Sequence, residues 1–125
     1  MDERQLGSTG ESVTAVGLGT WQIGGAWGDV PEEEGRDVVR AALDAGVNFL
    51  DTADVYGDGR SESLVADVLA EHDADPFVAT KAGRRLDPHV AEDYDLAHLS
   101  EFVDRSRENL ETETLDLVQL HCPPT

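Results

Sequence analysis

The sequence predicts an α/β protein built on a parallel β-sheet. Short apolar segments typical of strands alternate with longer segments of helical periodicity, in the order β-α-β-α-β-α-β. Alternation of this kind favours parallel strands joined by right-handed helical crossovers. No low-complexity linker or close repeat interrupts the 125 residues, so we predict one domain over residues 1–125.

The first strand and the first helix are predicted in the N-terminal third. Residues 12–21, SVTAVGLGTW, are apolar and rich in glycine towards their end, which is typical of a strand that runs into a loop. The residues before them leave room for a short hairpin. Residues 29–46 predict a helix, because Pro31 suits its first turn, glutamates follow at the positive end of the helix dipole, and Gly46 can end it.

Three strands and two helices are predicted in the remainder. The strands are VNFLD (47–51), PFVATK (76–81) and LDLVQLH (115–121). We expect Ser61 and Asp95 to cap the two helices between them. The last helix is expected to bury an apolar stripe made of Leu96, Leu99, Phe102, Val103 and Leu110.

Two folds accommodate this order of elements, an open doubly wound sheet and part of a (β/α)₈ barrel. The loop GLGTWQIGG, residues 17–25, begins as G-x-G but lacks the third glycine of the dinucleotide-binding fingerprint. It therefore counts against a cofactor cradle of the Rossmann type.

Polar side chains follow the predicted strands where chemistry is expected in either fold. Asp51, Lys81 and His121 each end a strand, and Tyr56 lies in the loop after the second strand. Because the carboxyl ends of parallel strands share one edge of a sheet or one mouth of a barrel, we expect these four side chains to converge.

The four side chains suit proton transfer to a carbonyl group. A free tyrosine has a pKa near 10, and the ammonium of Lys81 would lower the pKa of Tyr56 by favouring the phenolate. Asp51 would keep Lys81 charged and oriented. Tyr56 could then protonate a carbonyl oxygen as hydride reaches the carbon, while a hydrogen bond from His121 holds that oxygen.

Taken singly, these residues also have structural interpretations. Asp51 could hydrogen-bond the loop that follows it, Tyr56 could serve loop packing, and His121 could be a histidine satisfied before a proline turn. Trp21 and Trp27 are either core residues or walls of a substrate pocket.

Four stretches resemble the motifs of the aldo-keto reductases, in the family's order: GLGTWQIGG, NFLDTADVYG, VATKAG and DLVQLHCP. The resemblance implies a (β/α)₈ barrel that uses NADPH or NADH without a Rossmann fold. It implies Tyr56 as proton donor, Asp51 and Lys81 as the pair that tunes it, and His121 as the residue that orients a small carbonyl substrate. The residues of these motifs are most similar to those of the prokaryotic branch that acts on sugars, polyols and small aldehydes.

The resemblance also implies cofactor and substrate contacts. Cofactor contacts at the nicotinamide end are expected from Gly19, Thr20, Trp21 and Asp51. Substrate contacts are expected from Trp21, Trp27, Tyr56 and His121. Cys122 departs from the family, which often has tryptophan after this histidine.

The length of the chain predicts half of such a barrel. A complete (β/α)₈ barrel takes about 250 residues, whereas this chain has 125 residues and four predicted strands. We therefore expect an N-terminal half with about four parallel strands and three helices, truncated after the fourth strand and without the main cofactor-binding region. Its exposed sheet edges predict self-association or a companion chain that completes the barrel. An alternative function is that of a non-catalytic remnant or binding module.

Charge and composition exclude some classes of binding partner. The 27 acidic residues against 9 basic ones give a net charge of −18, which argues against binding to nucleic acid or anionic lipid. We interpret the acidic residues as a solvated surface. No apolar run approaches the roughly 18 residues of a membrane span, no secretory signal is visible, and Cys122 is alone, so we predict a cytoplasmic protein.

Other candidate groups are interpreted as structural. Asp54 and Asp58 are expected to be solvated loop residues. No metal site is predicted, because no zinc-type spacing is seen among His72, His89, His98 and His121.

Overall fold

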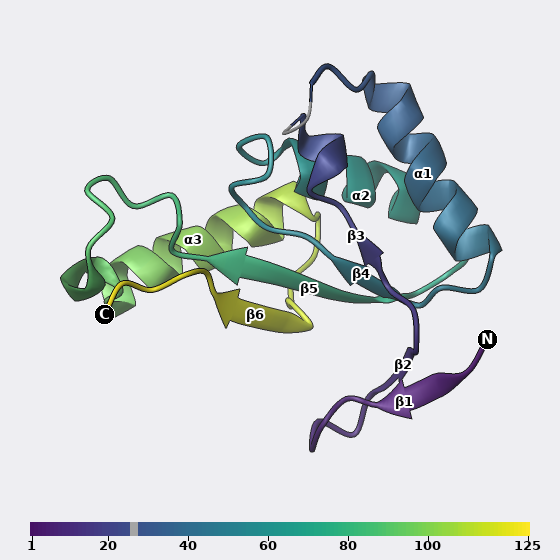
Figure 1. Ribbon diagram of the computed structural model, residues 1–125, viewed down its shortest axis with the longest axis horizontal. Coiled ribbons are helices and arrows are strands. Elements are labelled where there is room, and N and C mark those ends of the chain that lie inside the picture. Colours follow the sequence, from purple (N-terminus) through teal and green to yellow (C-terminus); the bar gives the residue numbers. More distant parts are fainter. Residues whose placement is uncertain (26–27) are drawn as a thin grey trace.

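The computed structural model describes residues 1–25 and 28–125. It is an α/β structure with a four-stranded parallel sheet and a separate two-stranded hairpin near the N-terminus (Figure 1). The strands of the sheet, in spatial order, are β3 (Leu18–Gly19), β4 (Phe49–Asp51), β5 (Phe77–Ala82) and β6 (Leu117–Leu120). Spatial order equals sequence order, and every pairing is parallel. This is the arrangement predicted for the first half of a (β/α)₈ barrel.

Among the described residues, three α-helices join the strands of the sheet: α1 (Glu32–Asp44), α2 (Arg60–Glu71) and α3 (Leu96–Asn109). The described connections also contain two short 3₁₀ helices, η1 (Gln22–Gly24) and η2 (Ala91–Asp93). The cap predicted at Asp95 is confirmed, because its carboxylate accepts from the backbone N–H of His98 at 2.9 Å. Gly46 has the left-handed φ of 91° expected after α1.

The prediction of one strand over residues 12–21 is wrong. The segment forms β2 (Ser12–Thr14), which pairs antiparallel with β1 (Glu3–Gln5), and then the separate strand β3. The hydroxyl of Thr14 donates to the carbonyl of Val16 at 2.7 Å, a local hydrogen bond that competes with continued strand pairing. The hairpin for which the sequence left room is therefore present.

Ser61 does not cap α2, contrary to the prediction. The helix begins at Arg60 after Gly59, which has a left-handed φ of 98°. Ser61 is fully buried, and its hydroxyl lies 2.7 Å from the hydroxyl of Thr20 and 3.0 Å from that of Thr52. Because Ser61 sits over the ends of β3 and β4, its side chain satisfies buried groups there and leaves the helix end to glycine.

The apolar stripe of α3 begins one turn later than predicted. Leu96 is 83% exposed, because it stands at the first helical position and faces away from the sheet. Phe102 is buried with Ala82 and Leu86 in a small cluster, and Leu110 belongs to the main core. Leu99 and Val103 are half-buried, and Leu110 directly follows the helix. The remainder of the predicted stripe is therefore buried only in part.

The main core lies between the sheet and the first two helices. Leu50 and Val78 point from neighbouring strands into this core. Their helical partners are Val39, Leu43, Leu64, Val65 and Val68. On the opposite face of the sheet, the rings of Phe49 and Phe77 stack with centroids 6.0 Å apart and stay partly exposed. One face of the sheet is thus covered by helices and the other is more open.

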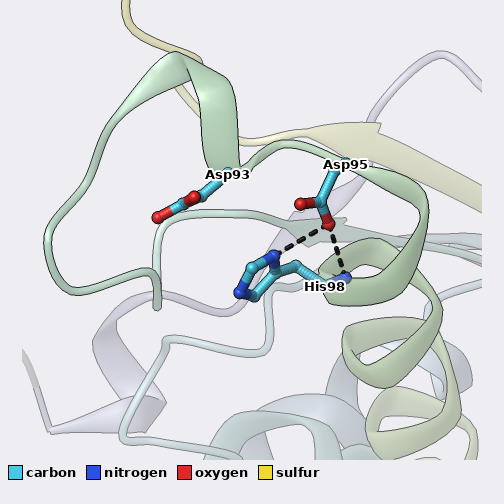
Figure 2. A group of neighbouring side chains, drawn as sticks. All are labelled: Asp93, Asp95 and His98. Atoms are coloured by element: carbon cyan, nitrogen blue, oxygen red, sulfur yellow. Dashed lines mark hydrogen bonds and ion pairs between the residues drawn. The ribbon is translucent and has the colours of Figure 1, made fainter.

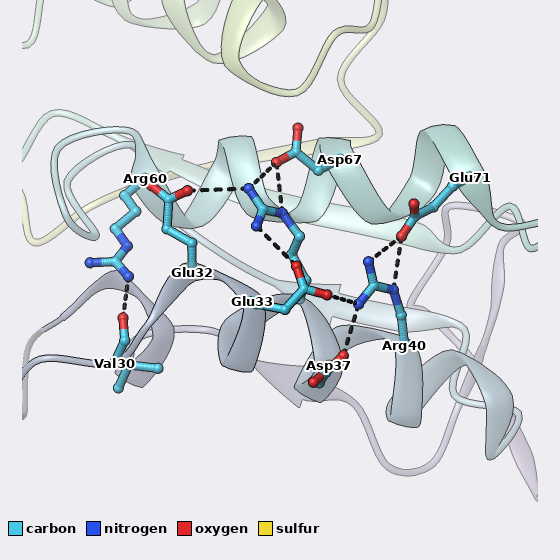
Figure 3. Close-up of polar contacts among 9 residues, drawn as sticks. Val30, Glu32, Glu33, Asp37, Arg40, Arg60, Asp67 and Glu71 are labelled. Atoms are coloured by element: carbon cyan, nitrogen blue, oxygen red, sulfur yellow. Dashed lines mark hydrogen bonds and ion pairs between the residues drawn. The ribbon is translucent and has the colours of Figure 1, made fainter.

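Arginines of α1 carry much of its polar contact with α2 (Figure 3). Arg36 contacts Asp67 at 3.0 Å, and Arg40 contacts Glu71 and its own-helix neighbour Glu33. The acidic partners are largely exposed, so single pairs of this kind add little to the free energy of unfolding. The network shows that part of the acidic surface is used to hold two helices together.

We predict that Ser61→Ala lowers the free energy of unfolding by about 1–3 kcal/mol, because it leaves buried hydroxyl and carbonyl groups of Thr20 and Thr52 without a partner. Urea denaturation followed by circular dichroism measures the change. Ser63→Ala on the same helix, where the side chain is only half-buried, is the matched control and should stay close to the parent chain.

Candidate functional site

Lys81 is the hub of a cluster of polar contacts at the carboxyl edge of the sheet. Its ammonium donates to both carboxylate oxygens of Asp51 at 2.9 Å and to the carbonyl of Thr52 at 2.8 Å. The same nitrogen lies 3.3 Å from the phenol oxygen of Tyr56. The expected convergence of these side chains is therefore observed.

Strand register places the charged pair. Asp51 ends β4 opposite Ala79 of β5, and Lys81 follows Ala79 by two residues. Side chains two residues apart in a strand share one face. Lys81 of β5 therefore points to the same side of the sheet as Asp51 and contacts the Asp51 carboxylate on the neighbouring strand β4.

Tyr56 is held by close backbone packing between its loop and η1. A Cβ atom on Gly24 would lie 2.8 Å from the carbonyl carbon of Tyr56, and one on Gly57 would lie 2.3 Å from the carbonyl oxygen of Gly24. Only glycine allows the two segments to approach this closely. The ring of Tyr56 is then fixed below the Lys81 ammonium, which lies 5.1 Å from the ring centroid.

His121 completes the cluster from the end of β6. Its ring meets that of Tyr56 edge to face, with centroids 6.1 Å apart, and its backbone N–H donates to the carbonyl of Ala82 at 2.8 Å. Burial lowers the pKa of His121, and the positive charges of Lys81 and Arg84 lower it further. The neutral imidazole is therefore favoured, and its buried Nδ1 has no partner within the described residues.

Tyr94 positions His121 and was not found by sequence reasoning. Its hydroxyl donates to the backbone carbonyl of His121 at 2.6 Å, and the ring of His89 contacts the same hydroxyl at 2.6 Å. Tyr94 packs so closely on Gly83 that a Cβ there would lie 2.2 Å from its ring. The residue lies in an irregular connection without periodicity, so no local pattern marks it.

A cavity of about 610 Å³ opens beside these groups. Trp21, Tyr56 and His121, three of the four residues expected to contact substrate, line it, and Trp21 is 44% exposed. Their substrate roles stay predictions. Arg84 lines it as well and was not predicted. Trp27, the fourth expected substrate contact, lies outside the described residues.

The residues expected to contact a cofactor gather where β3 meets β4. Gly19 pairs with Asp51 in register and has open space where a Cβ would stand. Thr20 is buried, and both its N–H and its hydroxyl donate to the carbonyl of Asp51 at 3.0 Å. Any cofactor contact at Thr20 would therefore involve its backbone. The cofactor roles of these residues and of Trp21 stay predictions.

The interpretation of Asp54 as a solvated loop residue is wrong. Asp54 is fully buried two residues before Tyr56, and neither carboxylate oxygen has a partner among the described residues. Burial raises the pKa of Asp54 to about 6, and the neighbouring charge of Glu62 adds to this rise. Asp58 is exposed as expected, and it pairs with Arg85 and Arg105.

Asp93, Asp95 and His98 form the group of potential metal ligands that the described residues contain (Figure 2). One ligand atom from each lies within 4.8 Å of the others. Asp95 is already engaged, because it accepts from both the backbone N–H and the ring Nδ1 of His98. These contacts explain the group as a helix cap, and the prediction of no metal site stays a prediction.

The helices in the described part of the chain are too short or too polar to cross a bilayer. This finding agrees with the absence of long apolar runs in the sequence.

Comparisons with known proteins match most of the chain. The profile of the aldo/keto reductase family matches residues 15–125. Aldo-keto reductase YhdN of Bacillus subtilis is 35% identical over an alignment of 127 residues, gaps included, which covers 98% of this chain and 38% of that protein.

Two solved structures show the same fold over nearly all of the chain. The glycerol dehydrogenase of Gluconobacter oxydans superposes with a TM-score of 0.81 at 34% identity, over 96% of this chain and 39% of that one. An aldo/keto reductase of Klebsiella pneumoniae, solved with NADP and acetate, gives 0.71 at 26% identity, over 90% of this chain and 36% of that one. The chain therefore spans well under half the length of the relatives it matches.

We predict that Asp54→Asn stabilises the fold at pH 7.5 but not at pH 4. The carboxyl has a higher pKa when folded, about 6, than its ordinary 3.8. Its favourable contribution to stability is therefore complete below the lower value and is lost as pH rises through the higher one. The variant should gain on the order of 2 kcal/mol in unfolding free energy at pH 7.5, measured by urea denaturation at both pH values.

Asp58→Asn is the matched control, with the opposite sign. Arg85 and Arg105 hold the pKa of Asp58 below its ordinary value, so its contribution to stability is present above that value and is lost as pH falls. This control should therefore weaken the fold at pH 7.5. An equal loss for Asp54→Asn at both pH values would contradict the inferred cost of its charge.

Proposed function

Because this chain belongs to the aldo/keto reductase family, we propose that it serves the NAD(P)H-dependent reduction of aldehydes or ketones to alcohols. The observation that carries this proposal is the contact of Lys81 with both the Asp51 carboxylate and the Tyr56 phenol. The chain supplies the N-terminal half of a barrel of this family, and the reaction takes place in the cytoplasm.

The residues at the ends of β3 and β4 fit a nicotinamide. Gly19 leaves its backbone open, and the partly exposed ring of Trp21 stands at the cavity. When bound, the reduced cofactor supplies hydride to the carbonyl carbon. The known structure of a relative with NADP supports NADPH as the first choice, with NADH as the alternative.

Protonation of the carbonyl oxygen is the task of this chain's own side chains. Tyr56 faces the cavity and donates the proton from its phenol oxygen. Lys81 stabilises the phenolate that forms, and Asp51 holds Lys81 in place with two hydrogen bonds. His121 orients the oxygen with its neutral ring. This ring lines the same cavity as Tyr56 and packs against the Tyr56 ring in an edge-to-face arrangement.

The substrate is a small carbonyl compound of the sugar, polyol or short aldehyde type. The relative from Gluconobacter oxydans is a glycerol dehydrogenase, which handles a polyol. The alternative function, a binding module without catalysis, keeps the cluster but takes up no cofactor.

We predict that NADPH quenches the fluorescence of the two tryptophans at micromolar concentration, because Trp21 borders the proposed cofactor site. Tyr56→Phe should keep this quenching and lower kcat by at least about 100-fold, because it removes the proton donor. Tyr94→Phe keeps that donor and should lose less. Absence of quenching in the parent chain would favour the binding module.

We also propose that the β6 edge of the sheet is covered by another polypeptide, either a second copy or a companion chain. Within the described residues, β6 pairs with β5 and with no strand on its other side. Val118 and Leu120 alternate along this edge strand and are 36% and 55% exposed. Edge strands with exposed apolar side chains favour association.

We predict that the purified chain forms a dimer or larger species in light scattering, above its 13.5 kDa monomer mass. Leu120→Glu should lower the measured mass by placing charge on the edge strand. Leu96→Glu makes the same change at a more exposed leucine away from this edge and should have no effect. A stable monomer of the parent chain would overturn the proposed self-association.

A further inference from the structure

The cavity beside Tyr56 differs in charge from the rest of the chain. Asp and Glu make up 27 of the 125 residues, about one in five. None of them is among the described residues that line this cavity, which are Trp21, Gly24, Gly25, Val55, Tyr56, Gly57, Arg84 and His121. Arg84 is the formal cation in this lining. The cavity is therefore locally positive on a strongly negative protein.

Two consecutive arginines follow β5 and are used differently. Arg85 donates to the Asp58 carboxylate at 3.1 Å, and its guanidinium lies 5.8 Å from the ring centroid of Phe102. Arg84 is exposed and has no hydrogen bond or ion pair within residues 1–25 and 28–125. Arg85 thus holds the loop, while Arg84 is left available to the cavity.

The missing partner is informative because carboxylates are abundant on this chain. Elsewhere Arg36, Arg40 and Arg107 each contact at least one carboxylate (Figure 3 labels Arg40). Arg4 and Arg60 donate instead to backbone carbonyls, so the other arginines all have a polar partner among the described residues. A guanidinium presents a planar fork of donors that matches carboxylate and phosphate groups in two-point contacts. An unpaired fork that lines a ligand-sized cavity is suited to an anion from solution.

We propose that Arg84 is a specificity-determining residue that binds an anionic group, a carboxylate or a phosphate, on the carbonyl substrate. The carbonyl end then lies at Tyr56 and His121 and the anionic end at Arg84, all three of which line the same cavity. This inference rests on the proposed function and narrows its substrates to aldehydes or ketones that carry an oxyanion.

The net charge of −18 does not prevent such binding. At physiological ionic strength, charges further away than about 8 Å are largely screened. The charges close to the cavity then decide its preference, and Arg84 is the one that lines it. The acidic groups next to the lining residues are offset, because Asp51 pairs with Lys81 and Asp58 pairs with Arg85 and Arg105. The buried Asp54 carboxyl has its pKa raised to about 6. Arg84 already acts on its surroundings, because its positive charge contributes to the lowered pKa of His121.

The first test needs no turnover. An anion bound to Arg84 offsets its charge, so succinate or inorganic phosphate should raise the pKa of His121 in an NMR titration of the purified chain. Succinamide, the neutral counterpart of succinate, should leave that pKa unchanged. Arg84→Gln should abolish the response, whereas Arg107→Gln on the exposed side of α3 should keep it. No response in the parent chain, or the same response in Arg84→Gln, would overturn the inference.

The second test uses the reaction. Succinic semialdehyde is compared with butanal, and glyceraldehyde 3-phosphate with glyceraldehyde, so the two pairs distinguish a carboxylate from a phosphate. Arg84→Gln should lower kcat/KM about 10- to 100-fold for the anionic member of the preferred pair and change the neutral member by less than about 3-fold. Equal losses of kcat/KM for both members would overturn the inference, because Arg84 would then shape the site without distinguishing anionic from neutral substrates.

The two tests separate failure of the inference from failure of the proposed function. If the protein reduces no carbonyl compound, the proposed function fails and the NMR titration alone decides whether Arg84 binds anions. If it reduces neutral aldehydes and the titration shows no Arg84-dependent response, the function stands and the inference falls. Urea denaturation of Arg84→Gln should match the parent chain, because the exposed side chain has no hydrogen bond or ion pair to lose within residues 1–25 and 28–125.

Discussion

The ammonium of Lys81 is the constraint on which the rest of the site depends. It is the only lysine of the sequence, and its side chain is 16% exposed. A charge so far removed from water needs close partners, and the structure supplies the Asp51 carboxylate and the carbonyl of Thr52. These contacts fix the end of β4 relative to β5. The phenol of Tyr56 is then brought within 3.3 Å of a cation that cannot move away without losing its own hydrogen bonds.

A second layer of polar groups under this pair holds the loops that carry the site. The hydroxyl of Ser61 bonds to the hydroxyls of Thr20 and Thr52 where β3, β4 and α2 meet. Next to them, Asp54 buries a carboxyl group without partners among the described residues. The first group stabilises the fold, whereas the second lowers its stability at neutral pH. A destabilising group this close to Tyr56 is typical of functional sites, where stability is given up for chemistry.

Features with a strong local or periodic signal could be predicted from the sequence. The alternation of elements predicted the parallel sheet. The strand ends at Asp51, Lys81 and His121 predicted where the candidate site lies. The predictions failed where long-range contacts outweigh local preference. Ser61 looks like a helix cap, but its hydroxyl is drawn to Thr20, which is 41 residues away in the sequence. Asp54 resembles a solvated loop residue until packing covers it, and Tyr94 acquires its role only because β6 places the carbonyl of His121 beside it.

Solubility and substrate binding place opposite demands on the charges of this protein. Acidic side chains spread over the surface keep the net charge at −18, which favours a dispersed, soluble chain and repels anions over long distances. A site for a polarised carbonyl needs the reverse, since negative charge develops on the oxygen as hydride arrives. The structure meets both demands by leaving carboxylates out of the described cavity lining and by pairing the carboxylate of Asp51 with Lys81. The proposed reduction thus relies on the positive charge of Lys81, 3.3 Å from the phenol oxygen of Tyr56, a distance over which salt screens little.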